Sequence, residues 1–319
     1  MDQVLEVQDL HVSFFTQRGE VKAVDGVTFH VNRGEVFGLA GESGCGKSTT
    51  AYAILRLIKP PGRIVSGRII CDGLDVLNLK EEDLRAYRWK KVSMIFQNAM
   101  NCLNPVHKIS EQIAEAIMVH EKISKQDALT RAKQLLSLVG IDESRANDYP
   151  HQFSGGMRQR AVIAMALALN PVLLIADEPT TALDVVVARQ VLEIIWDMKR
   201  RFGLSILFIT HDLSTLSEFS NRIAVMYAGE LVEMADTKQL FSNPLHPYTD
   251  GLIRSLTSFM HRGKKLWSIP GSPPDLASKI RGCRFRPRCP IAVEKCFYEK
   301  PKLIKIGHDH YVACHKVTS

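Results

Sequence analysis

The sequence lacks a long apolar run, and this absence limits what the chain can be. Its longest apolar stretch, Ala161 to Leu169, ends at Asn170-Pro171 and is far shorter than the roughly 20 residues of a membrane-spanning helix. The amino terminus has no basic segment leading into an apolar one, so it lacks the pattern of a secretory signal peptide. Apolar residues make up 45% and charged residues 24% of the chain, which excludes disordered and collagen-like classes. We expect a soluble globular protein.

Acidic residues are scarce at one end of the chain. Residues 251–319 contain 14 Lys and Arg against 4 Asp and Glu, whereas the first 250 residues contain 27 against 30. A uniformly basic chain would indicate a nucleic-acid partner, but here the excess is local. The length of 319 residues predicts two domains, or one large domain with an appendage. The near-neutral body and the basic end are therefore interpreted separately.

The first part of the body predicts strands that lead into a glycine-rich loop. Period-2 patterning is typical of half-buried strands, and Asp25-Gly26 is a turn signal. The alternating positions are Val4 to Val7, then Val21, Ala23, Val27, Phe29 and Val31. The apolar run Glu35 to Ala40 is followed by the nine residues Gly41 to Thr49 and a helical stretch through Ile58. Strand, loop and helix stand in the order of a P-loop.

The residue types of this loop fit phosphate binding. Glycine lets successive backbone N–H groups turn inward around phosphates, and the helix that opens at Lys47 adds the positive end of its dipole. We expect Lys47 to reach the β- and γ-phosphates and the Ser48 hydroxyl to ligate Mg²⁺. A helix start can lower the pKa of Cys45, although a small residue that fills a tight loop is the simpler interpretation.

A second motif follows about 130 residues later. The apolar run Val172 to Ala176 predicts a buried strand that ends at Asp177-Glu178. Asp177 is placed to hold the Mg²⁺ shell, and Glu178 to act as general base toward an attacking water. The alternative is a solvated acidic pair at a strand end. With a P-loop upstream, ATP hydrolysis is the better interpretation.

Further motifs resemble those of the ATP-binding-cassette (ABC) ATPases. Phe153 to Arg160 resembles their signature motif, Gln97 their Q-loop, Ala182-Leu183-Asp184 their D-loop and His211 their switch histidine. These motifs occur in the order and spacing of the family, and the resemblance covers about residues 3–258. Met157 replaces the usual final Gln of the signature.

The resemblance implies an α/β fold: a P-loop NTPase (RecA-like) core with an antiparallel β subdomain, an inserted helical subdomain and a small C-terminal extension. It implies a sandwich dimer in which Ser154 and Gly156 face the nucleotide of the partner subunit. Phe14 would stack on adenine, with Phe15 as the competitor. The expected catalytic residues are Glu178, His211, Gln97 and Lys47. The expected ATP-binding residues are Phe14, Gly41, Ser43, Gly44, Cys45, Gly46, Lys47, Ser48, Thr49, Gln97, Ser154, Gly156 and Asp177, of which Ser48, Gln97 and Asp177 would bind Mg²⁺.

The expected organisation follows from the same motifs. Residues 1–258 form the ATPase domain, with a helical subdomain at about 98–160 that contains runs of helical period at Ile109–His120 and Lys125–Leu138. Such a subdomain would dock on a membrane-spanning partner, beginning at Asn98–Val106; a turn forced by Asn104-Pro105 is the alternative for that stretch. Residues 259–319 form the extension.

The end of the chain resembles the ATPases of dipeptide and oligopeptide importers. The similarity lies in Asn243 to Thr249, the proline-rich segment Ile269 to Leu276, which is not expected to be helical, and Gly282 to Pro290. It implies a peptide substrate, with oligosaccharides or nickel as alternative cargoes.

Closely spaced cysteine pairs are also missing from this end. Its four cysteines, Cys283, Cys289, Cys296 and Cys314, have the spacing C-x5-C-x6-C-x17-C, without the C-x2-4-C pair of structural zinc sites. Four irregularly spaced thiolates and a Cys-Pro step fit a [4Fe–4S] cluster, whose negative charge the neighbouring arginines Arg284, Arg286 and Arg288 would offset. The cysteine-bearing tail resembles that of peptide-importer ATPases that carry an iron–sulfur cluster. Zinc, with His315 as a further ligand, and free thiols remain alternatives.

Together these features predict an ATP-hydrolysing subunit of a membrane importer. Its partners would be a second ABC ATPase (a heterodimer, or a homodimer), two transmembrane permease subunits and, through the complex, an extracellular substrate-binding protein. Its place would be the cytoplasmic face of the cell membrane. A soluble ABC ATPase acting on nucleic acid or ribosomes is the competing hypothesis; its usual second cassette or long coiled-coil insertion is missing, so no nucleic-acid partner is expected.

Overall fold

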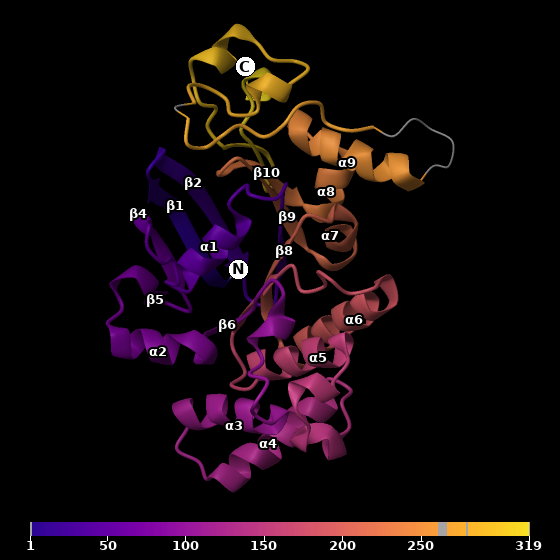
Figure 1. Cartoon of the computed structure of the whole chain (residues 1–319). Coiled ribbons are helices and arrows are strands. Elements are labelled where there is room, and N and C mark those ends of the chain that lie inside the picture. Colours follow the sequence, from indigo (N-terminus) through magenta and orange to yellow (C-terminus); the bar gives the residue numbers. More distant parts are fainter. Residues whose placement is uncertain (1, 261–266, 279, 319) are drawn as a thin grey trace.

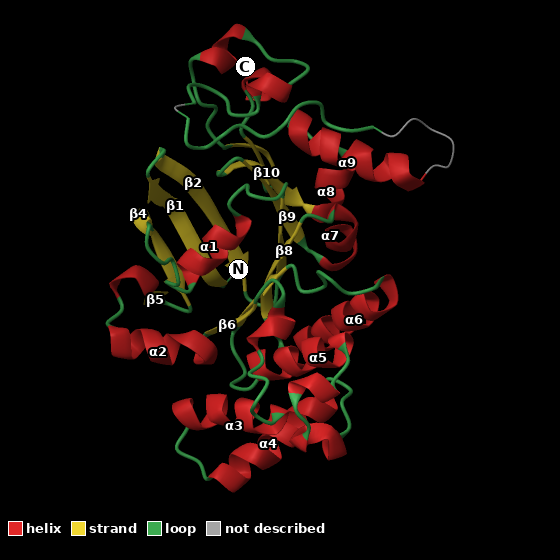
Figure 2. Ribbon diagram, in the orientation of Figure 1, coloured by secondary structure: helices red, strands yellow, loops and turns green. Residues whose placement is uncertain are grey.

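Two sheets and the helices around them make up the computed structural model (Figures 1 and 2), which describes residues 2–260, 267–278 and 280–318. The strands are β1 (Gln3–Thr16), β2 (Gly19–Asn32), β3 (Val36–Ala40), β4 (Gly62–Cys71), β5 (Leu74–Asp75), β6 (Val92–Ile95), β7 (Leu173–Asp177), β8 (Ser205–Thr210), β9 (Arg222–Tyr227), β10 (Glu230–Asp236), β11 (Ile304–Gly307) and β12 (His310–Val312). The α-helices are α1 (Lys47–Ile54), α2 (Glu81–Lys90), α3 (Ile109–His120), α4 (Lys125–Leu138), α5 (Gly155–Ala166), α6 (Val185–Phe202), α7 (Leu213–Phe219), α8 (Thr237–Ser242), α9 (Pro247–Met260) and α10 (His315–Thr318).

The central sheet has the strand order β11-β12-β10-β9-β3-β8-β7-β6. Strands β9, β3, β8, β7 and β6 are parallel to their neighbours in this run, and β10, β12 and β11 continue it as antiparallel strands. Every residue of β3, β7 and β8 is buried, as expected for parallel strands covered on both faces. The smaller sheet, β2-β1-β4-β5, is wholly antiparallel. The α/β P-loop fold class predicted from the motifs is confirmed.

The helices between Gln97 and β7 lie at one end of the molecule, and the C-terminal segment lies at the other (Figure 1). Helices α3 and α4 have the bounds that the sequence periodicity predicts. Each buries its apolar stripe against the same core cluster as α5, because Leu, Ile and Ala recur at three- and four-residue spacing. The Ser124 hydroxyl caps α4 by accepting from the Asp127 N–H. The division into subdomains at 98–160 and 259–319 stays a prediction.

Two local predictions are wrong. Asp25-Gly26 is not a turn but lies inside β2, where Gly26 has φ +82° and the register with β1 shifts between Leu10 and His11. A glycine with positive φ at a register shift is typical of a β-bulge. Helix α1 ends at Ile54 rather than continuing to Ile58, since Arg56 adopts φ +49° ahead of Pro60-Pro61.

The C-terminal extension completes the central sheet instead of standing apart from it. β12 pairs with β10 at Glu233–Val312 and Met234–Tyr311. The Glu233 carboxylate is wholly buried, and the Nε2 of His310 donates to it at 2.7 Å. The same carboxylate accepts from the Leu245 and His246 N–H groups, at 2.7 and 2.9 Å, just before α9. The proline-rich segment 269–276 is not helical, as predicted.

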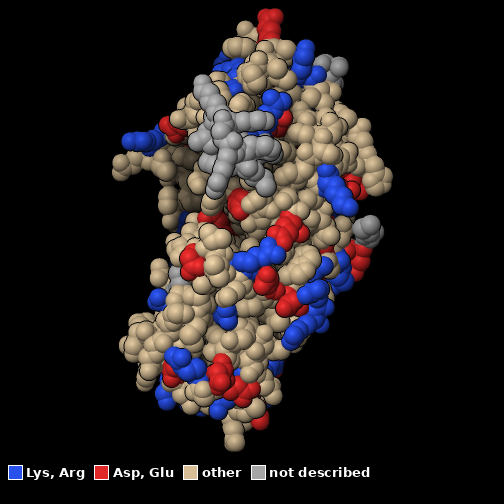
Figure 3. All heavy atoms as spheres, turned by 90° about the vertical axis from the view of Figure 1, so that its right-hand side faces the viewer, with Lys and Arg blue, Asp and Glu red and all other residues tan. Residues whose placement is uncertain are grey.

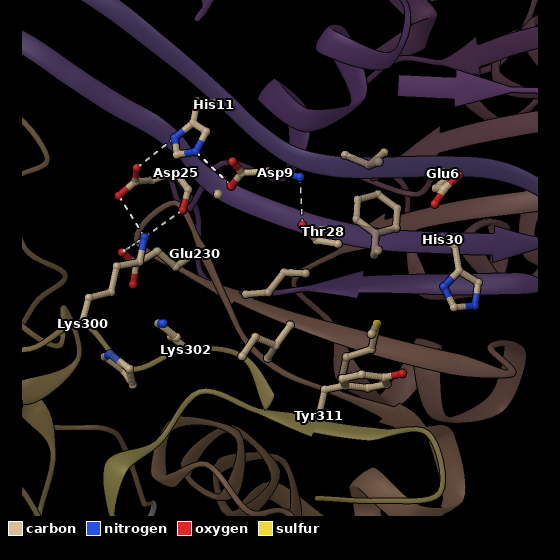
Figure 4. Close-up of a pocket in the computed structure, with 17 residues that line it drawn as sticks. Glu6, Asp9, His11, Asp25, Thr28, His30, Glu230, Lys300, Lys302 and Tyr311 are labelled. Atoms are coloured by element: carbon tan, nitrogen blue, oxygen red, sulfur yellow. Dashed lines mark hydrogen bonds and ion pairs between the residues drawn. The ribbon is translucent and has the colours of Figure 1, made fainter. Parts of the chain in front are cut away.

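Cations of the extension pair with anions of the ATPase body. The Arg284 guanidinium contacts Asp25 and Glu230, and Lys300 contacts the same two carboxylates at 3.2 and 3.0 Å. Figure 4 shows Lys300 beside Asp25 and Glu230, at one end of a cavity of about 610 Å³. The charge of Arg284 therefore anchors the extension to β2 and β10, rather than serving mainly to offset a metal cluster. Within the described ranges, no helix combines the length and apolarity needed to cross a membrane.

Candidate nucleotide-binding site

The glycine-rich loop connects β3 to α1 as predicted. Its first residue, Gly41, has φ +147°, and a Cβ there would lie 2.3 Å from the Met226 carbonyl oxygen. At Gly46, with φ +107°, a Cβ would lie 2.3 Å from the Ala23 carbonyl oxygen. Both positions require glycine, because any side chain would collide with backbone that cannot move aside. The loop is thus packed against β9 and β2 on its outer side.

A cavity of about 150 Å³ lies inside the loop, and eight of the described residues line it: Ser43, Gly44, Gly46, Lys47, Ser48, Thr49, Gln97 and Glu178. All eight belong to the motifs singled out in the sequence. Lys47 is buried, and its Nζ donates to the carbonyl oxygens of Gly41 (2.7 Å) and Glu42 (3.1 Å). An ammonium held by two neutral acceptors is an attractive partner for phosphate oxygens.

Asp177 at the end of β7 fits the role of a magnesium-shell residue. It is wholly buried, and neither carboxylate oxygen has a hydrogen-bond partner of normal geometry among the residues that the structure describes. Burial raises the pKa of Asp177, and the nearby Ser48 hydroxyl acts in the opposite direction. A buried carboxylate without partners is costly unless a ligand or cation satisfies it. Hard oxygen donors of this kind suit Mg²⁺.

Glu178 is the centre of a hydrogen-bonded group. It lies directly after β7 with φ +45°, a conformation that is strained for a residue with a side chain and is found at functional sites. Gln97 Nε2 and the Thr181 hydroxyl each donate to its Oε2 at 3.0 Å, and His211 Nδ1 lies 3.0 Å from Oε1. Burial would raise the pKa of Glu178, but the hydrogen bonds from His211 and Thr181 outweigh it and lower the pKa. Glu178 is therefore a carboxylate at neutral pH.

The His211 tautomer follows from this contact. A carboxylate only accepts, so Nδ1 carries the proton and donates to Glu178. In the neutral imidazole, Nε2 is then the unprotonated nitrogen and can accept a hydrogen bond from a ligand. The side chain of His211 is mostly exposed, and it contacts Glu178, which lines the phosphate cavity, without lining the cavity itself.

Comparison with known proteins agrees with this geometry. Residues 24–181 match the family model described as ABC transporter, and residues 232–296 match the model described as oligopeptide/dipeptide transporter, C-terminal region. The oligopeptide transport ATP-binding protein OppD of Bacillus subtilis is 48% identical over 314 residues, which cover 97% of this chain and 88% of OppD. The chain belongs to the ABC transporter ATPase family. The dipeptide transport ATP-binding protein DppD of the same organism is 45% identical, with coverage of 98% and 95%.

Solved ABC structures share the fold. The ATP-binding cassette MJ0796, a dimer in a post-hydrolysis state with ADP and Pi, has a TM-score of 0.66 and 27% identity over 73% of this chain and 98% of its own. The cbiO1 protein of Clostridium perfringens has a TM-score of 0.65 and 26% identity over 76% and 92%. Together with the cassette motifs, these matches identify the protein as an ATP-hydrolysing subunit.

Some predicted ABC residues lie outside the phosphate cavity. Ser154 caps α5 by accepting from the Met157 N–H at 3.3 Å, and at Gly156 a Cβ would lie 2.6 Å from Val187 Cγ1. Neither residue lines the cavity of its own chain, so their role toward a partner's nucleotide stays a prediction. Cys45 is buried, and burial raises its pKa despite the nearby Lys47. It is therefore a packing residue of the loop, not an activated thiol.

Phe14 also lies outside the cavity. It stands opposite Gly62 of β4, where a Cβ would come within 2.7 Å of the Phe14 ring. Phe15 is exposed, and the Arg63 guanidinium lies 5.8 Å from its ring centroid. The adenine contact of Phe14 stays a prediction.

Three residues that touch the ABC motifs were not predicted from the sequence. Thr181 donates to Glu178, and its position in Glu178-Pro179-Thr180-Thr181 could have signalled a polar contact in the turn. Tyr248 and Arg288 both reach Glu42 of the P-loop. Both residues lie more than 200 positions after Glu42 in the sequence, and no local sequence pattern predicts such a contact.

The four C-terminal cysteines are close but do not form a single-ion site. Burial is the main cause that raises the pKa of Cys283 to about 11 and also raises those of Cys289 and Cys314, and charge on the neighbouring thiols adds to each increase. Among the described residues, no three His, Cys, Asp or Glu side chains are arranged to hold a metal ion. His315 Nε2 donates to the Glu299 carbonyl oxygen at 2.9 Å. The predicted iron–sulfur or zinc site is thus not supported by the observed side-chain geometry or by the family matches.

Proposed function

We propose that this chain couples ATP binding and hydrolysis to the uptake of dipeptides or oligopeptides through a membrane permease. The main support for this proposal is that two features occur in one chain. The side chains of Gln97 and His211 contact Glu178, and the same chain matches the C-terminal region of oligopeptide and dipeptide transporters. The names of the relatives OppD and DppD support peptides as the transported class.

The site geometry supports hydrolysis by an activated water. The backbone N–H groups of the P-loop and Lys47 would hold the β- and γ-phosphates. Ser48 and Asp177, with Gln97, would hold Mg²⁺, which when bound neutralises charge on the phosphates. The Glu178 carboxylate would accept the proton of the attacking water as the water oxygen bonds to the γ-phosphorus. The bond from that phosphorus to the β–γ bridging oxygen would break, and ADP and phosphate would leave. His211 Nε2 would contact the γ-phosphate and hold it in line.

A dimer of two cassettes is part of this proposal. Val185 and Val186, directly after Asp184 of the D-loop motif, are neighbouring apolar side chains that are 86% and 67% exposed. They would be covered when Ser154 and Gly156 face the nucleotide of a second ABC ATPase. The partner is a related subunit in a heterodimer, with a homodimer as the alternative outcome.

Docking on two permease subunits would place the chain at the cytoplasmic face of the membrane, beneath an extracellular substrate-binding protein. The docking segment would begin at Asn98–Val106, where Val106 is 72% exposed. On the face shown in Figure 3, Lys and Arg are interspersed with Asp and Glu, and exposed ion pairs such as Arg189–Glu218 are formed in the structure. A mixed surface of this kind favours a protein partner over a nucleic acid.

Purification from membranes tests the partner. We expect the tagged chain, extracted in mild detergent, to bring multispanning membrane proteins with it. Val106→Asp should lose them, because a charge would be buried at the docking segment. Val65→Asp, at an exposed site of β4 outside the helical subdomain, serves as the control and should retain them. Recovery of nucleic acid instead of membrane proteins would contradict the proposal.

We further propose that the cysteine group holds a [4Fe–4S] cluster. All four thiols lie near Cys296 or one another, while Gly282, with φ +71°, lets the turn of Cys283 approach the Cys296 carbonyl, where a Cβ would come within 2.2 Å. The irregular spacing of the four cysteines, without a C-x2-4-C pair and with a Cys-Pro step at Cys289, fits a cluster better than a structural zinc site.

Anaerobic purification tests the cluster. We expect a brown protein with about four iron and four sulfide ions per chain. Cys296→Ser should lose the colour, and Cys102→Ser, a thiol elsewhere in the chain, should keep it. Because burial keeps Cys283 protonated at neutral pH, loading should release protons. A colourless anaerobic protein, or one that holds stoichiometric zinc, would reject the cluster.

A further inference from the structure

Glu42 stands at the junction between the P-loop and the C-terminal extension. It is the second residue of the loop Gly41–Thr49, but it does not line the phosphate cavity. Its backbone carbonyl oxygen accepts from Lys47 Nζ at 3.1 Å and from the Cys45 N–H at 3.3 Å. Its carboxylate points the other way, to Arg288. One residue therefore contacts the catalytic lysine with its backbone and the extension with its side chain.

The contact with Arg288 is bidentate. Arg288 Nη1 donates to Glu42 Oε2 at 2.7 Å and Nη2 donates to Oε1 at 3.0 Å. Paired, charge-assisted bonds of this geometry are among the strongest polar contacts in proteins and fix orientation as well as distance. The Arg288 side chain is 4% exposed, whereas that of Glu42 is 29% exposed. Water and salt therefore screen the pair only weakly.

The extension holds Arg288 rigidly. Its Nε donates to the Pro270 carbonyl oxygen at 2.9 Å, and its guanidinium lies 5.7 Å from the centroid of the Tyr227 ring. Phe285, three residues earlier, packs against Tyr227 and against Tyr248 of α9, with centroid distances of 5.1 and 5.4 Å. The Tyr248 hydroxyl accepts from the Glu42 N–H at 3.0 Å. Glu42 is thus held at both backbone and side chain by residues from the region 248–288.

We propose that Arg288 is a positioning residue for the P-loop, through which the C-terminal extension sets the affinity of the ATPase for nucleotide. By fixing the Glu42 carboxylate, Arg288 fixes the Glu42 carbonyl that holds Lys47, and so the place from which Lys47 meets the phosphates. The ABC ATPase site is therefore completed by a residue 241 positions after Lys47, outside the cassette motifs. This inference rests on ATP binding at the P-loop, which the wild type tests in the same experiment.

The test compares full-length variants in ATP binding and turnover. Arg288→Met removes the charge and keeps the length of the side chain, and Glu42→Gln removes the charge of its partner. We expect each to weaken ATP binding about fivefold or more, within the usual range of coupling between sites. KM for ATP should rise while kcat stays within about twofold, because the groups around Glu178 are unchanged. Arg288→Lys keeps the charge but loses the two parallel N–H donors. Its affinity for ATP should lie between those of Arg288→Met and the wild type.

Two comparisons separate positioning from a general loss of structure. Arg286→Met changes a neighbouring arginine on the same turn, which stacks 4.6 Å from the Phe297 ring centroid and does not reach Glu42; it should bind ATP as the wild type does. The Arg288→Met/Glu42→Gln double variant should be no weaker than the weaker single variant, because both break one contact. If Arg288→Met does not fold, the partly exposed Glu42→Gln carries the test.

Two outcomes would overturn the proposal. One is wild-type ATP affinity in Glu42→Gln and in folded Arg288→Met. The other is a double variant whose loss equals the product of the two single losses, since independent effects would exclude a shared contact. Absence of ATP binding by the wild type would instead contradict the ATPase assignment, so the two failures are distinguishable.

Discussion

We expect the Glu178→Gln variant to bind ATP and to hydrolyse it at least about 100-fold more slowly than the wild type, the usual contribution of a general base. Glutamine keeps the size of the side chain and can still contact Thr181 and His211, but it cannot accept the proton of the attacking water. ATP should therefore remain bound between two cassettes and hold the dimer closed. Phosphate release under single-turnover conditions and gel filtration with Mg²⁺ and ATP measure the two effects.

A surface glutamate provides the control for this substitution. Glu193 lies on α6 and pairs only with Arg189 in the described contacts, so Glu193→Gln should hydrolyse ATP at the wild-type rate and should not accumulate as a dimer. Normal turnover by Glu178→Gln would mean that another group accepts the proton. Because hydrogen bonds lower the pKa of Glu178, loss of wild-type activity from protonation of this base should appear only below the usual glutamate range.

The second large effect concerns stability. We expect His310→Ala to lower the free energy of unfolding by about 3–5 kcal/mol, because it leaves the buried Glu233 carboxylate without its imidazole partner. Glu233→Leu should cost more, since it also leaves the Leu245 and His246 N–H groups before α9 without an acceptor. Thermal unfolding of His310→Ala should shift down by about 5–8 °C.

An exposed residue on the adjacent strand provides the matched comparison. Lys305 of β11 is exposed and pairs with Asp309, so Lys305→Ala should change the stability by no more than about 0.5 kcal/mol. A His310→Ala protein that unfolds at the wild-type temperature would show that the pair adds nothing. Equal losses in His310→Ala and Lys305→Ala would mean that truncating any side chain in the extension has the same effect.

The sequence predicted well those features that depend on neighbouring residues. The P-loop requires glycine at Gly41 and Gly46 for reasons of local backbone geometry, and the helix bounds of α3 and α4 follow from side-chain period alone. The resemblance to the cassette motifs named Gln97, Glu178 and His211 as catalytic residues, and the structure brings their side chains into contact.

Features that depend on distant pairing were not predicted. Asp25-Gly26 has the composition of a turn, yet pairing with β1 stretches it into a bulged strand. β11 and β12 are short and carry no clear alternation, so their addition to the central sheet could not be seen from local pattern. The arginines of the extension were interpreted beside their sequence neighbours, the cysteines, whereas Arg284 and Arg288 pair with acids that lie more than 240 residues earlier.

The pairing of β10 with β12 has a consequence for how the chain is made. During synthesis Glu233 leaves the ribosome 77 residues before His310, and β10 cannot gain its outer neighbour until then. The motifs for ATP are all present by that stage, but the sheet edge beside them still exposes unpaired backbone groups. A nascent chain that has not yet reached β12 therefore keeps this edge of β10 open, and the ATPase sheet is completed only by the last residues to be made.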